Sequence, residues 1–204
     1  MFIPVILGTA REGRESEKVA RYLLAEVKAA GIETEMLDVR DYRIVATDKT
    51  GEPAQAKALS PKIERADGII IVTPEYNHGY PGELKMMLDL LYTQWQKKPV
   101  GFAGVSSGGL GGARVVEQMR EVIAELHMVD VREALYFSNV QDLFDGKGAI
   151  KDASLYRDRV KNFLDELVCS ESGPPGEREE REHCDDVHAG GVGAVHRALR
   201  QRQT

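Results

Sequence analysis

Three segments of the sequence combine glycine with hydroxyl, charged or aromatic residues in a way that suits ligand binding. The first covers residues 8–18 (GTAREGRESEK) and lies between an apolar stretch and a helical pattern. A loop that leaves a buried strand and enters a helix offers free backbone N–H groups and the positive end of the helix dipole, and both attract a phosphate. Two hydroxyls and three cations could complete such a cradle, namely Thr9, Ser16, Arg11, Arg14 and Lys18.

A second interpretation of this segment stays open, in which Ser16 only caps the helix and the charged side chains face solvent. Two well-known phosphate motifs are excluded. A P-loop requires lysine and then serine or threonine after its last glycine, whereas Arg14 and Glu15 follow Gly13. The dinucleotide fingerprint Gly-x-Gly-x-x-Gly is also absent from the sequence. A phosphate bound here would therefore need a loop of another kind.

The second segment, residues 73–85 (TPEYNHGYPGELK), contains two prolines, which stiffen the chain, and two glycines, which let a ligand approach the backbone. Asn77 offers a hydrogen-bond donor and an acceptor, and Tyr76 and Tyr80 offer aromatic faces that suit a flat ring. His78 could act as a general acid, although a single exposed histidine is more often inert. The alternative is an ordinary turn with incidental aromatic residues.

The third segment, residues 106–112 (SSGGLGG), has four glycines within five residues and precedes a helical pattern. Because glycine has no Cβ atom, such a loop can bring backbone amides close to the edge of a ligand. A glycine run alone indicates little. Its weight comes from its position, since it follows the next strand after the second segment.

Hydrophobic patterning predicts the elements that position these segments. Apolar runs predict five strands, at residues 2–8, 32–39, 67–73, 100–106 and 130–137. Apolar residues at helical spacing predict helices at 16–30, 60–66, 82–96, 110–127 and 153–168. This alternation indicates an α/β fold with a doubly wound five-stranded parallel sheet. Right-handed crossovers then place all three segments at one edge of the sheet, where ligands bind in such folds.

Composition fits a single domain without a nucleic-acid or membrane partner. The chain has 204 residues, of which 42% are hydrophobic and 29% charged, and its formal net charge is −6. That charge argues against binding nucleic acid by neutralising phosphates. No apolar run approaches the roughly 20 residues of a membrane span. Two cysteines are too few for a disulfide framework, which fits a cytoplasmic protein.

Residues 169–204 differ in composition from the rest of the chain. They contain Gly-Pro-Pro-Gly, a run of Glu and Arg, and Gly-Gly-Val-Gly. Such a segment has too few apolar residues to offset the entropy of ordering it, so we predict a disordered tail after a domain at residues 1–168. His183, Cys184 and His188 could bind a metal there, but their spacing matches no structural zinc pattern and we expect no metal site.

The second segment also resembles a known family. Its pattern T-P-E-Y-N-x-G-Y-P-G-x-L-K at 73–85 is similar to the flavin-ring loop of the NADPH-dependent FMN reductases, a flavodoxin-like family that includes quinone, azo and chromate reductases. The first segment, G-T-x-R-x-x-R-x-S-x-K, resembles that family's FMN-phosphate loop, and S-x-G-G-x-G-G at 106–112 resembles its third flavin loop. The resemblance covers about residues 2–168 and implies the flavodoxin-like strand order 2-1-3-4-5.

The resemblance implies FMN as the cofactor and assigns residues to it. Arg11, Ser16 and Lys18 would hold the phosphate. The isoalloxazine ring would lie against two short stretches, which are Pro74, Glu75, Tyr76 and Asn77 in one loop and Ser107, Gly108 and Gly109 in the other. Two positions depart from the family: Thr9 replaces the serine of many members, and His78 stands where small residues are frequent.

By the same resemblance, the chain would be an NAD(P)H-dependent FMN reductase. Hydride would pass from NADPH or NADH through FMN to a small acceptor such as a free flavin, a quinone, an azo compound or a metal oxyanion. The cofactor carries this chemistry, so no catalytic side chain is expected. The alternatives are an FMN-free regulatory protein and a non-enzymatic electron carrier of the flavodoxin type. Short-chain flavodoxins hold the phosphate without a cation, whereas this loop contains Arg11, Arg14 and Lys18.

Members of this family are commonly dimers or tetramers that bury the helix after the second loop. In the helix predicted at 82–96, four large apolar residues lie off the stripe that faces the sheet, namely Met86, Leu90, Tyr92 and Trp95. That is more apolar surface than a solvated helix needs, which predicts a homodimer or homotetramer.

Overall fold

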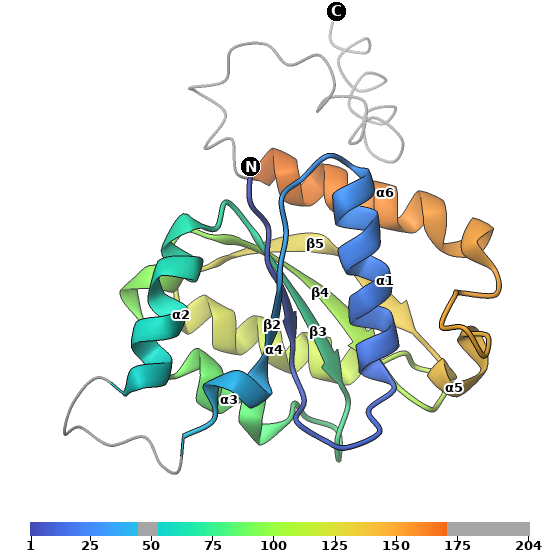
Figure 1. Ribbon diagram of the computed structural model, residues 1–204, viewed down its shortest axis with the longest axis horizontal. Helices are drawn as coiled ribbons and strands as arrows, with labels where there is room; N and C mark the ends of the chain where they lie inside the picture. Colours follow the sequence, from blue (N-terminus) through green and yellow to red (C-terminus); the bar gives the residue numbers. More distant parts are fainter. Residues whose placement is uncertain (45–52, 171–204) are drawn as a thin grey trace, which may run out of the picture.

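The structure, a computed structural model, describes residues 1–44 and 53–170, in which five parallel strands form one sheet between two layers of helices (Figure 1). The strands are β1 (Val5–Leu7), β2 (Met36–Asp38), β3 (Ile69–Pro74), β4 (Pro99–Val105) and β5 (Val129–Phe137). Their order across the sheet is β2-β1-β3-β4-β5, and every neighbouring pair is parallel. The predicted doubly wound, flavodoxin-like sheet is therefore confirmed.

The central strand β3 shows why the sheet forms. Its sequence IIIVTP is buried at every position, and β-branched residues suit a strand that has neighbours on both sides. Ile71 and Thr73 point to one face of the sheet and Ile70 and Val72 to the other, because side chains alternate along a strand. Two hydrophobic cores result, one on each face, with Ile71 in the first and Ile70 in the second.

Helices close both cores. The helical elements are α1 (Ser16–Ala29), η1 (Val39–Tyr42), α2 (Ala54–Arg65), α3 (Gly82–Leu88), η2 (Thr93–Trp95), α4 (Ala113–Glu125), α5 (Val140–Leu143) and α6 (Ala153–Ser170). The core that contains Ile70 is covered by α1 and α6, and the core that contains Ile71 by α2, α3 and α4. In Figure 1, α1 accordingly lies to the right of the strands and α2 to the left.

The helix predicted at 82–96 is the main error. α3 ends at Leu88, and the chain turns before the short 3-10 helix η2. This break brings the Trp95 side chain into the core, where it is fully buried and its indole Nε1 donates to the carbonyl oxygen of Leu88 at 3.0 Å. The prediction that Trp95 lies on an exposed surface is therefore wrong. Tyr92 is exposed, whereas Met86 and Leu90 are partly buried.

The helix predicted at 60–66 is longer than expected. α2 begins at Ala54 and contains Pro61 in its interior. A proline there removes a backbone hydrogen bond and costs about 3 kcal/mol in an isolated helix. Here the fully buried face formed by Leu59 and Ile63 holds the helix together across the proline.

Two further differences between predicted and observed element boundaries affect the site. The strand predicted at 32–39 is limited to β2, so the chain is free to form η1 next to the first segment. The helix predicted at 110–127 begins only at Ala113, which leaves all four glycines of the third segment in a loop. The predicted tail with its His183, Cys184 and His188 lies among residues 171–204, outside the described part of the chain.

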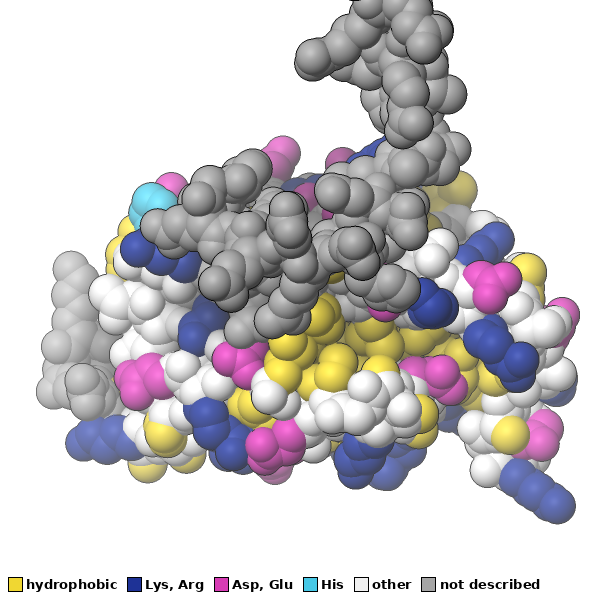
Figure 2. Space-filling model, turned by 90° about the horizontal axis from the view of Figure 1, so that it is seen from above, with side chains coloured by type: hydrophobic (Ala, Val, Ile, Leu, Met, Phe, Trp, Pro, Cys, Tyr) yellow, Lys and Arg dark blue, Asp and Glu magenta, His cyan; other side chains and the backbone are white. Residues whose placement is uncertain are grey.

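The ends of β1, β3 and β4 place the three segments at the lower edge of the sheet in Figure 1. Figure 2 shows the opposite edge, where hydrophobic side chains lie among charged ones. None of the described helices is long and apolar enough to cross a membrane. Within the described residues, no three His, Cys, Asp or Glu side chains gather as a metal site would require.

Candidate functional site

The three segments meet because β1, β3 and β4 are neighbours in the sheet. Two contacts join them. The hydroxyl oxygens of Thr9 and Tyr76 lie 3.1 Å apart, which links the first segment to the second. The backbone N–H of Glu75 donates to the carbonyl oxygen of Val105 at 3.0 Å, which links the second to the strand that leads into the third. The predicted residues of the three loops are thus brought to one edge.

Arg14 is turned into the protein rather than toward a ligand. Its side chain is 4% exposed, and its guanidinium donates to both carboxylate oxygens of Asp38, to Glu17 Oε2 and to the carbonyl oxygen of Thr9. The hydrogen bonds to Asp38 raise the pKa of Arg14. Burial works to raise the pKa of Asp38, but the hydrogen bonds from Arg14 and from the backbone outweigh it and lower that pKa. Both groups are therefore charged and paired, and Arg14 is not available as the phosphate cation that the sequence suggested.

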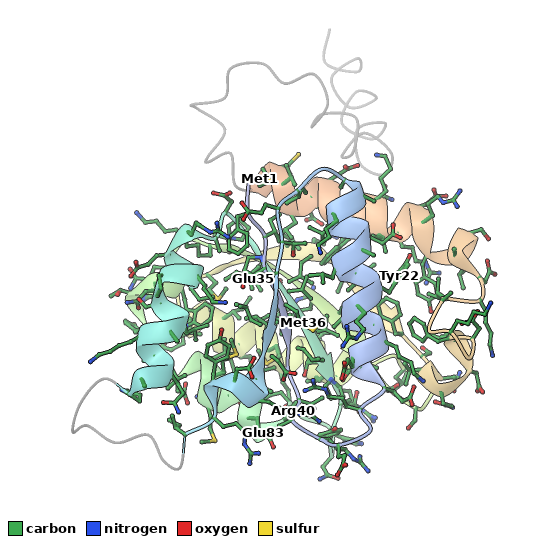
Figure 3. The ribbon with its side chains drawn as sticks, viewed as in Figure 1. Met1, Tyr22, Glu35, Met36, Arg40 and Glu83 are labelled. Carbon is green, nitrogen blue, oxygen red and sulfur yellow. The ribbon has the colours of Figure 1, made fainter. Side chains whose placement is uncertain are left out.

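Arg40 holds the same segment from the exposed side. It belongs to η1, directly after β2, and Figure 3 shows it at the edge of the sheet where the segments lie. Its Nε donates to the carbonyl oxygen of Ala10 at 3.1 Å, and its terminal nitrogen donates to that of Arg11 at 2.7 Å. Sequence reasoning missed Arg40 and Asp38, because no local spacing relates them to a loop some 30 residues away.

The Ser16 hydroxyl is buried and has no hydrogen-bond partner among the described residues. The N-cap of α1 is Glu15, so the interpretation of Ser16 as a helix cap is wrong. A buried hydroxyl without a partner costs free energy. The first N–H groups of a helix have no partner within the helix, and in α1 those of Glu17 and Lys18 donate to the carbonyl oxygens of Arg14 and Glu15, while the positive end of the helix dipole remains. Ser16 and the start of α1 therefore fit a ligand that brings acceptor oxygens, as a phosphate does.

Arg11 and Lys18 are more exposed to solvent than Arg14. The guanidinium carbon of Arg11 lies 5.8 Å from the centre of the Tyr76 ring. Lys18 Nζ lies 2.7 Å from Glu15 Oε2, and both side chains of this ion pair are more than one-third exposed. An exposed pair of this kind contributes at most about 1 kcal/mol. Either cation can therefore turn toward an anion without losing a strong interaction.

The second segment forms a tight turn after Pro74, the last residue of β3. Tyr76 and Gly79 exchange two backbone hydrogen bonds, at 2.8 and 2.9 Å, around Asn77 and His78. These two residues have φ of 51° and 67°, the left-handed conformation that both central positions of a type I′ turn require. Asn77 adopts it readily, and the His78 carbonyl oxygen accepts from Gln118 Nε2 at 2.7 Å. The turn holds both side chains at the exposed tip of the loop.

Glu75 is the buried acid of the site. Its side chain is 6% exposed, and its Oε1 accepts from Arg114 Nε at 2.6 Å, at the start of α4. Its Oε2 is buried without a hydrogen-bond partner in the described part of the chain. The sequence pointed to Glu75 but not to Arg114, because a pairing between two loops leaves no local pattern. Together, Ser16 and Glu75 provide two unsatisfied buried oxygens at this edge.

The third segment is folded tightly against β4. A Cβ atom at Gly104 would lie 2.6 Å from the carbonyl oxygen of Gly111, and one at Gly112 would lie 2.7 Å from the backbone nitrogen of Val105. Gly108 and Gly109, in contrast, have open space around them. Their carbonyl oxygens accept from the hydroxyls of Ser106 at 2.8 Å and Ser138 at 2.9 Å. Ser107 lies in the same stretch, where its carbonyl oxygen accepts from Gln141 Nε2 at 3.4 Å.

A hollow of about 750 Å³ adjoins the second segment. It is lined by Arg43, Ile44, Gly82, Glu83 and Met86. Figure 3 shows Glu83 at the same edge of the sheet as Arg40. The hollow thus lies at the end of the second segment where α3 begins, next to Arg43 and Ile44.

Several known proteins are similar to this chain in sequence. An NAD(P)H-dependent FMN reductase of Schizosaccharomyces pombe is 35% identical over 136 residues, which cover 62% of this chain and 67% of that protein. A quinone reductase of Escherichia coli K12 is 32% identical over 146 residues, which cover 68% and 77%. An FMN-dependent NADPH-azoreductase of Staphylococcus aureus is 29% identical over 183 residues, which cover 85% and 96%.

Solved structures agree in fold. A flavoenzyme NAD(P)H:(acceptor) oxidoreductase of Paracoccus denitrificans superposes with a TM-score of 0.68 at 21% identity, over 81% of this chain and 96% of that one. A flavodoxin variant of Pseudomonas aeruginosa gives a TM-score of 0.53 at 20% identity, over 82% and 99%. The family model for NADPH-dependent FMN reductase matches residues 1–142, a range that contains all three segments and the five strands that position them. The chain therefore belongs to the NADPH-dependent FMN reductase family.

Proposed function

We propose that the protein is an NAD(P)H-dependent FMN oxidoreductase that passes hydride from a reduced nicotinamide to a small acceptor. The observation that carries this proposal is the hydroxyl of Ser16 at the start of α1, buried and without a partner in the described part of the chain, in a member of an FMN reductase family. Bound FMN would supply the hydride-transfer chemistry, so the protein's task is to bind and orient it.

Arg11, Ser16 and Lys18 would hold the FMN phosphate. Ser16 would donate its hydroxyl, which has no partner among the described residues. Arg11 and Lys18 would add charge from the solvent side, and the positive end of α1 would favour the dianion. The site needs no contribution from Arg14, whose charge is already balanced by Asp38.

The second and third segments would line the isoalloxazine ring. The residues proposed for this role are Pro74, Glu75, Tyr76, Asn77, Ser107, Gly108 and Gly109. The carbonyl oxygens of Gly108 and Gly109 are held by Ser106 and Ser138, and the two glycines have open space on their other side. The backbone N–H groups of this loop are therefore suited to stabilise negative charge that develops on the ring during the reaction.

The acceptor class follows from the relatives rather than from the site. Proteins similar to this chain are named quinone reductase and azoreductase, so quinones and azo compounds are the first acceptors to test, with free flavins and metal oxyanions next. The co-substrate would be NADPH or NADH. The non-enzymatic electron carrier is the weaker alternative, because the sequence relatives are reductases and flavodoxins share only the fold.

A steady-state assay tests the proposal. The full chain is loaded with FMN, and oxidation of NADPH and of NADH is followed at 340 nm with a quinone, an azo dye or free FMN as acceptor. We expect acceptor-dependent oxidation well above that of an equal concentration of free FMN alone. An electron carrier would instead be reduced by dithionite but show no turnover with either nicotinamide, and that outcome would overturn the proposal.

We also propose that residues 1–168 form the flavodoxin-like domain, and that the protein is a cytoplasmic homodimer or homotetramer. Support for the domain is that Leu167 and Val168 pack against the core and are the last described residues to do so. Support for an oligomer is the 48% exposed Tyr92 beside the partly buried Leu90. Light scattering coupled to gel filtration checks this, and a monomer mass near 22.6 kDa would contradict it.

A further inference from the structure

We propose that Arg40 and Arg14 are positioning residues for the phosphate loop: they hold the carbonyl oxygens of residues 9–11 on one side, so that the N–H groups of that stretch face the phosphate. The inference rests on the proposed function, because it concerns the phosphate of FMN. Neither arginine would contact the ligand itself.

The contacts form a continuous series along the chain. The Arg14 guanidinium donates to the carbonyl oxygen of Thr9. The Arg40 guanidinium then spans the next two peptide groups, with 3.1 Å from Nε to the carbonyl oxygen of Ala10 and 2.7 Å from its terminal nitrogen to that of Arg11. Three consecutive carbonyl oxygens are therefore bound by two cations.

The orientation of the N–H groups follows from peptide geometry. In a planar trans peptide group, the carbonyl oxygen and the N–H of the next residue point in opposite directions. When the carbonyl oxygens of residues 9–11 face the two guanidinium groups, the N–H groups of Ala10, Arg11 and Glu12 face the other side. The Arg11 N–H donates to Thr9 Oγ1 at 3.3 Å, and within the described residues those of Ala10 and Glu12 have no hydrogen-bond partner.

Asp38 bonds both arginines and so fixes their positions relative to each other. Its carboxylate accepts from both terminal nitrogens of Arg14 and from the backbone N–H of Arg40, the latter at 3.0 Å. A carboxylate near a phosphate site would normally repel the ligand, but the charge of Asp38 is balanced by Arg14. The end of β2 thus fixes the shape of a loop that begins at the end of β1.

Without these contacts, the carbonyl oxygens of residues 9–11 could turn toward the ligand side, where their partial negative charge repels phosphate oxygens. The defect would be specific to the phosphate. Binding of the flavin ring would not change, because the ring would lie against the second and third segments. Affinity for FMN relative to riboflavin therefore measures the positioning role directly.

The test uses Arg40, which is exposed, so its variants keep the core intact. FMN and riboflavin are titrated into the flavin-free full chain and followed by quenching of flavin fluorescence. In Arg40→Gln, we expect the Kd for FMN to rise about tenfold, as loss of two hydrogen bonds predicts, with the Kd for riboflavin unchanged within about twofold. Arg40→Lys keeps the charge but cannot bond two adjacent carbonyl oxygens in a fork, so most of the loss should remain.

Arg21→Gln is the matched control. Arg21 also carries an exposed positive charge, 69% exposed on α1, but among residues 1–44 and 53–170 it bonds only Glu17 and none of the loop carbonyl oxygens. We expect its Kd for FMN to stay within about twofold of wild type. An equal loss in Arg21→Gln and Arg40→Gln, or full binding by Arg40→Lys, would mean that Arg40 acts only through its charge and would overturn the inference.

Failure of the inference differs from failure of the proposed function. If the wild type binds FMN no more tightly than riboflavin, the phosphate does not bind at this loop and the proposed site is wrong. If the wild type prefers FMN and Arg11→Gln removes the preference, but Arg40→Gln and Arg40→Lys retain it, the site stands and the positioning role alone is rejected. Arg14→Gln is a second test of that role where the variant folds, since it frees the carbonyl oxygen of Thr9.

Discussion

The first and third segments lie at the same edge of the sheet but are shaped in opposite ways. In the first, charged side chains bind the loop: Arg14, within the segment and anchored by Asp38, and Arg40, from the end of β2, hold its carbonyl oxygens. In the third, the absence of side chains lets backbone pack on backbone, and a Cβ atom at Gly104 would lie 2.6 Å from the carbonyl oxygen of Gly111.

The difference shows two ways to fix a ligand loop. Ion pairs and charge-assisted hydrogen bonds depend on the protonation of their side chains. Each can be removed separately by mutating that side chain, which can lie outside the loop. Close packing of glycines does not depend on pH, and it tolerates almost no change at the glycines themselves. We therefore expect mutations at the packed glycines of the third segment, Gly111 and Gly112, to affect folding, and mutations in the first segment to affect binding and pH dependence.

The largest effect is expected for Gly112→Ala. Gly112 has φ of 82°, and a Cβ atom there would lie 2.7 Å from the backbone nitrogen of Val105. Left-handed strain and overpacking together should lower the free energy of unfolding by about 2–5 kcal/mol. Urea unfolding of the flavin-free chain measures this, with Gly109→Ala as the control, because nothing lies within 4 Å of a Cβ atom at that position. Equal stability of the two variants would contradict the packing described for this loop.

Arg11→Gln should act on binding instead. A charge-assisted hydrogen bond to phosphate contributes about 1.5–3 kcal/mol, so the Kd for FMN should rise roughly 10- to 100-fold. The free energy of unfolding should change by less than about 0.5 kcal/mol, because Arg11 is exposed. Titration with FMN and with riboflavin checks the first expectation. Equal losses for both flavins would show that Arg11 does not contact the phosphate.

Asp38→Asn tests the pH dependence of the first segment. The pKa of Asp38 in the folded protein lies below its usual value of 3.8, so its ion pair stabilises the fold above that pH and stops doing so as pH falls through the folded-state pKa. The variant should be less stable than wild type by about 1–3 kcal/mol at pH 7, and the difference should begin to shrink only once the pH falls below 3.8. Urea unfolding at pH 7, 5 and 3 measures the difference. A difference that does not change with pH would show that Asp38 acts through its shape and not its charge.

Tyr76→Phe gives the smallest effect and tests the link between the first two segments. It removes the hydroxyl that lies 3.1 Å from Thr9 Oγ1, and we expect a loss of about 0.5–1.5 kcal/mol in the free energy of unfolding. A double-mutant cycle with Thr9→Val isolates this contact, and additive losses would show that the two loops are not coupled there.

Sequence patterns were sufficient for the sheet because each strand is signalled by its own residues. The run IIIVTP identifies β3 without reference to any other part of the chain. Gly108 and Gly109 were also correctly predicted to lie in a loop, because glycine itself is the signal. Gly111 and Gly112 were wrongly included in the helix predicted at 110–127, which begins only at Ala113. The helix at 82–96 was wrong for the opposite reason: burial of Trp95 depends on the carbonyl oxygen of Leu88 and on the core around it, which helical spacing does not encode.

The same limit applies to the candidate site. Arg11, Ser16 and Glu75 lie within recognisable motifs, so they could be found from the sequence. Arg40 and Asp38 lie outside every motif, and Arg14 looks like a free cation until its partner Asp38, 24 residues away, is known. Side chains that contact a ligand leave a local pattern more often than side chains that hold the loop in place.

The buried Trp95 has a further consequence for spectroscopy. It is the only tryptophan in the chain and is fully shielded from solvent. An indole in an apolar core fluoresces at shorter wavelength than one in water, so a red shift of the emission would report opening of the α3–η2 region. Binding at the sheet edge would not require any such shift. The emission wavelength of this one tryptophan thus reports opening of this region without a label.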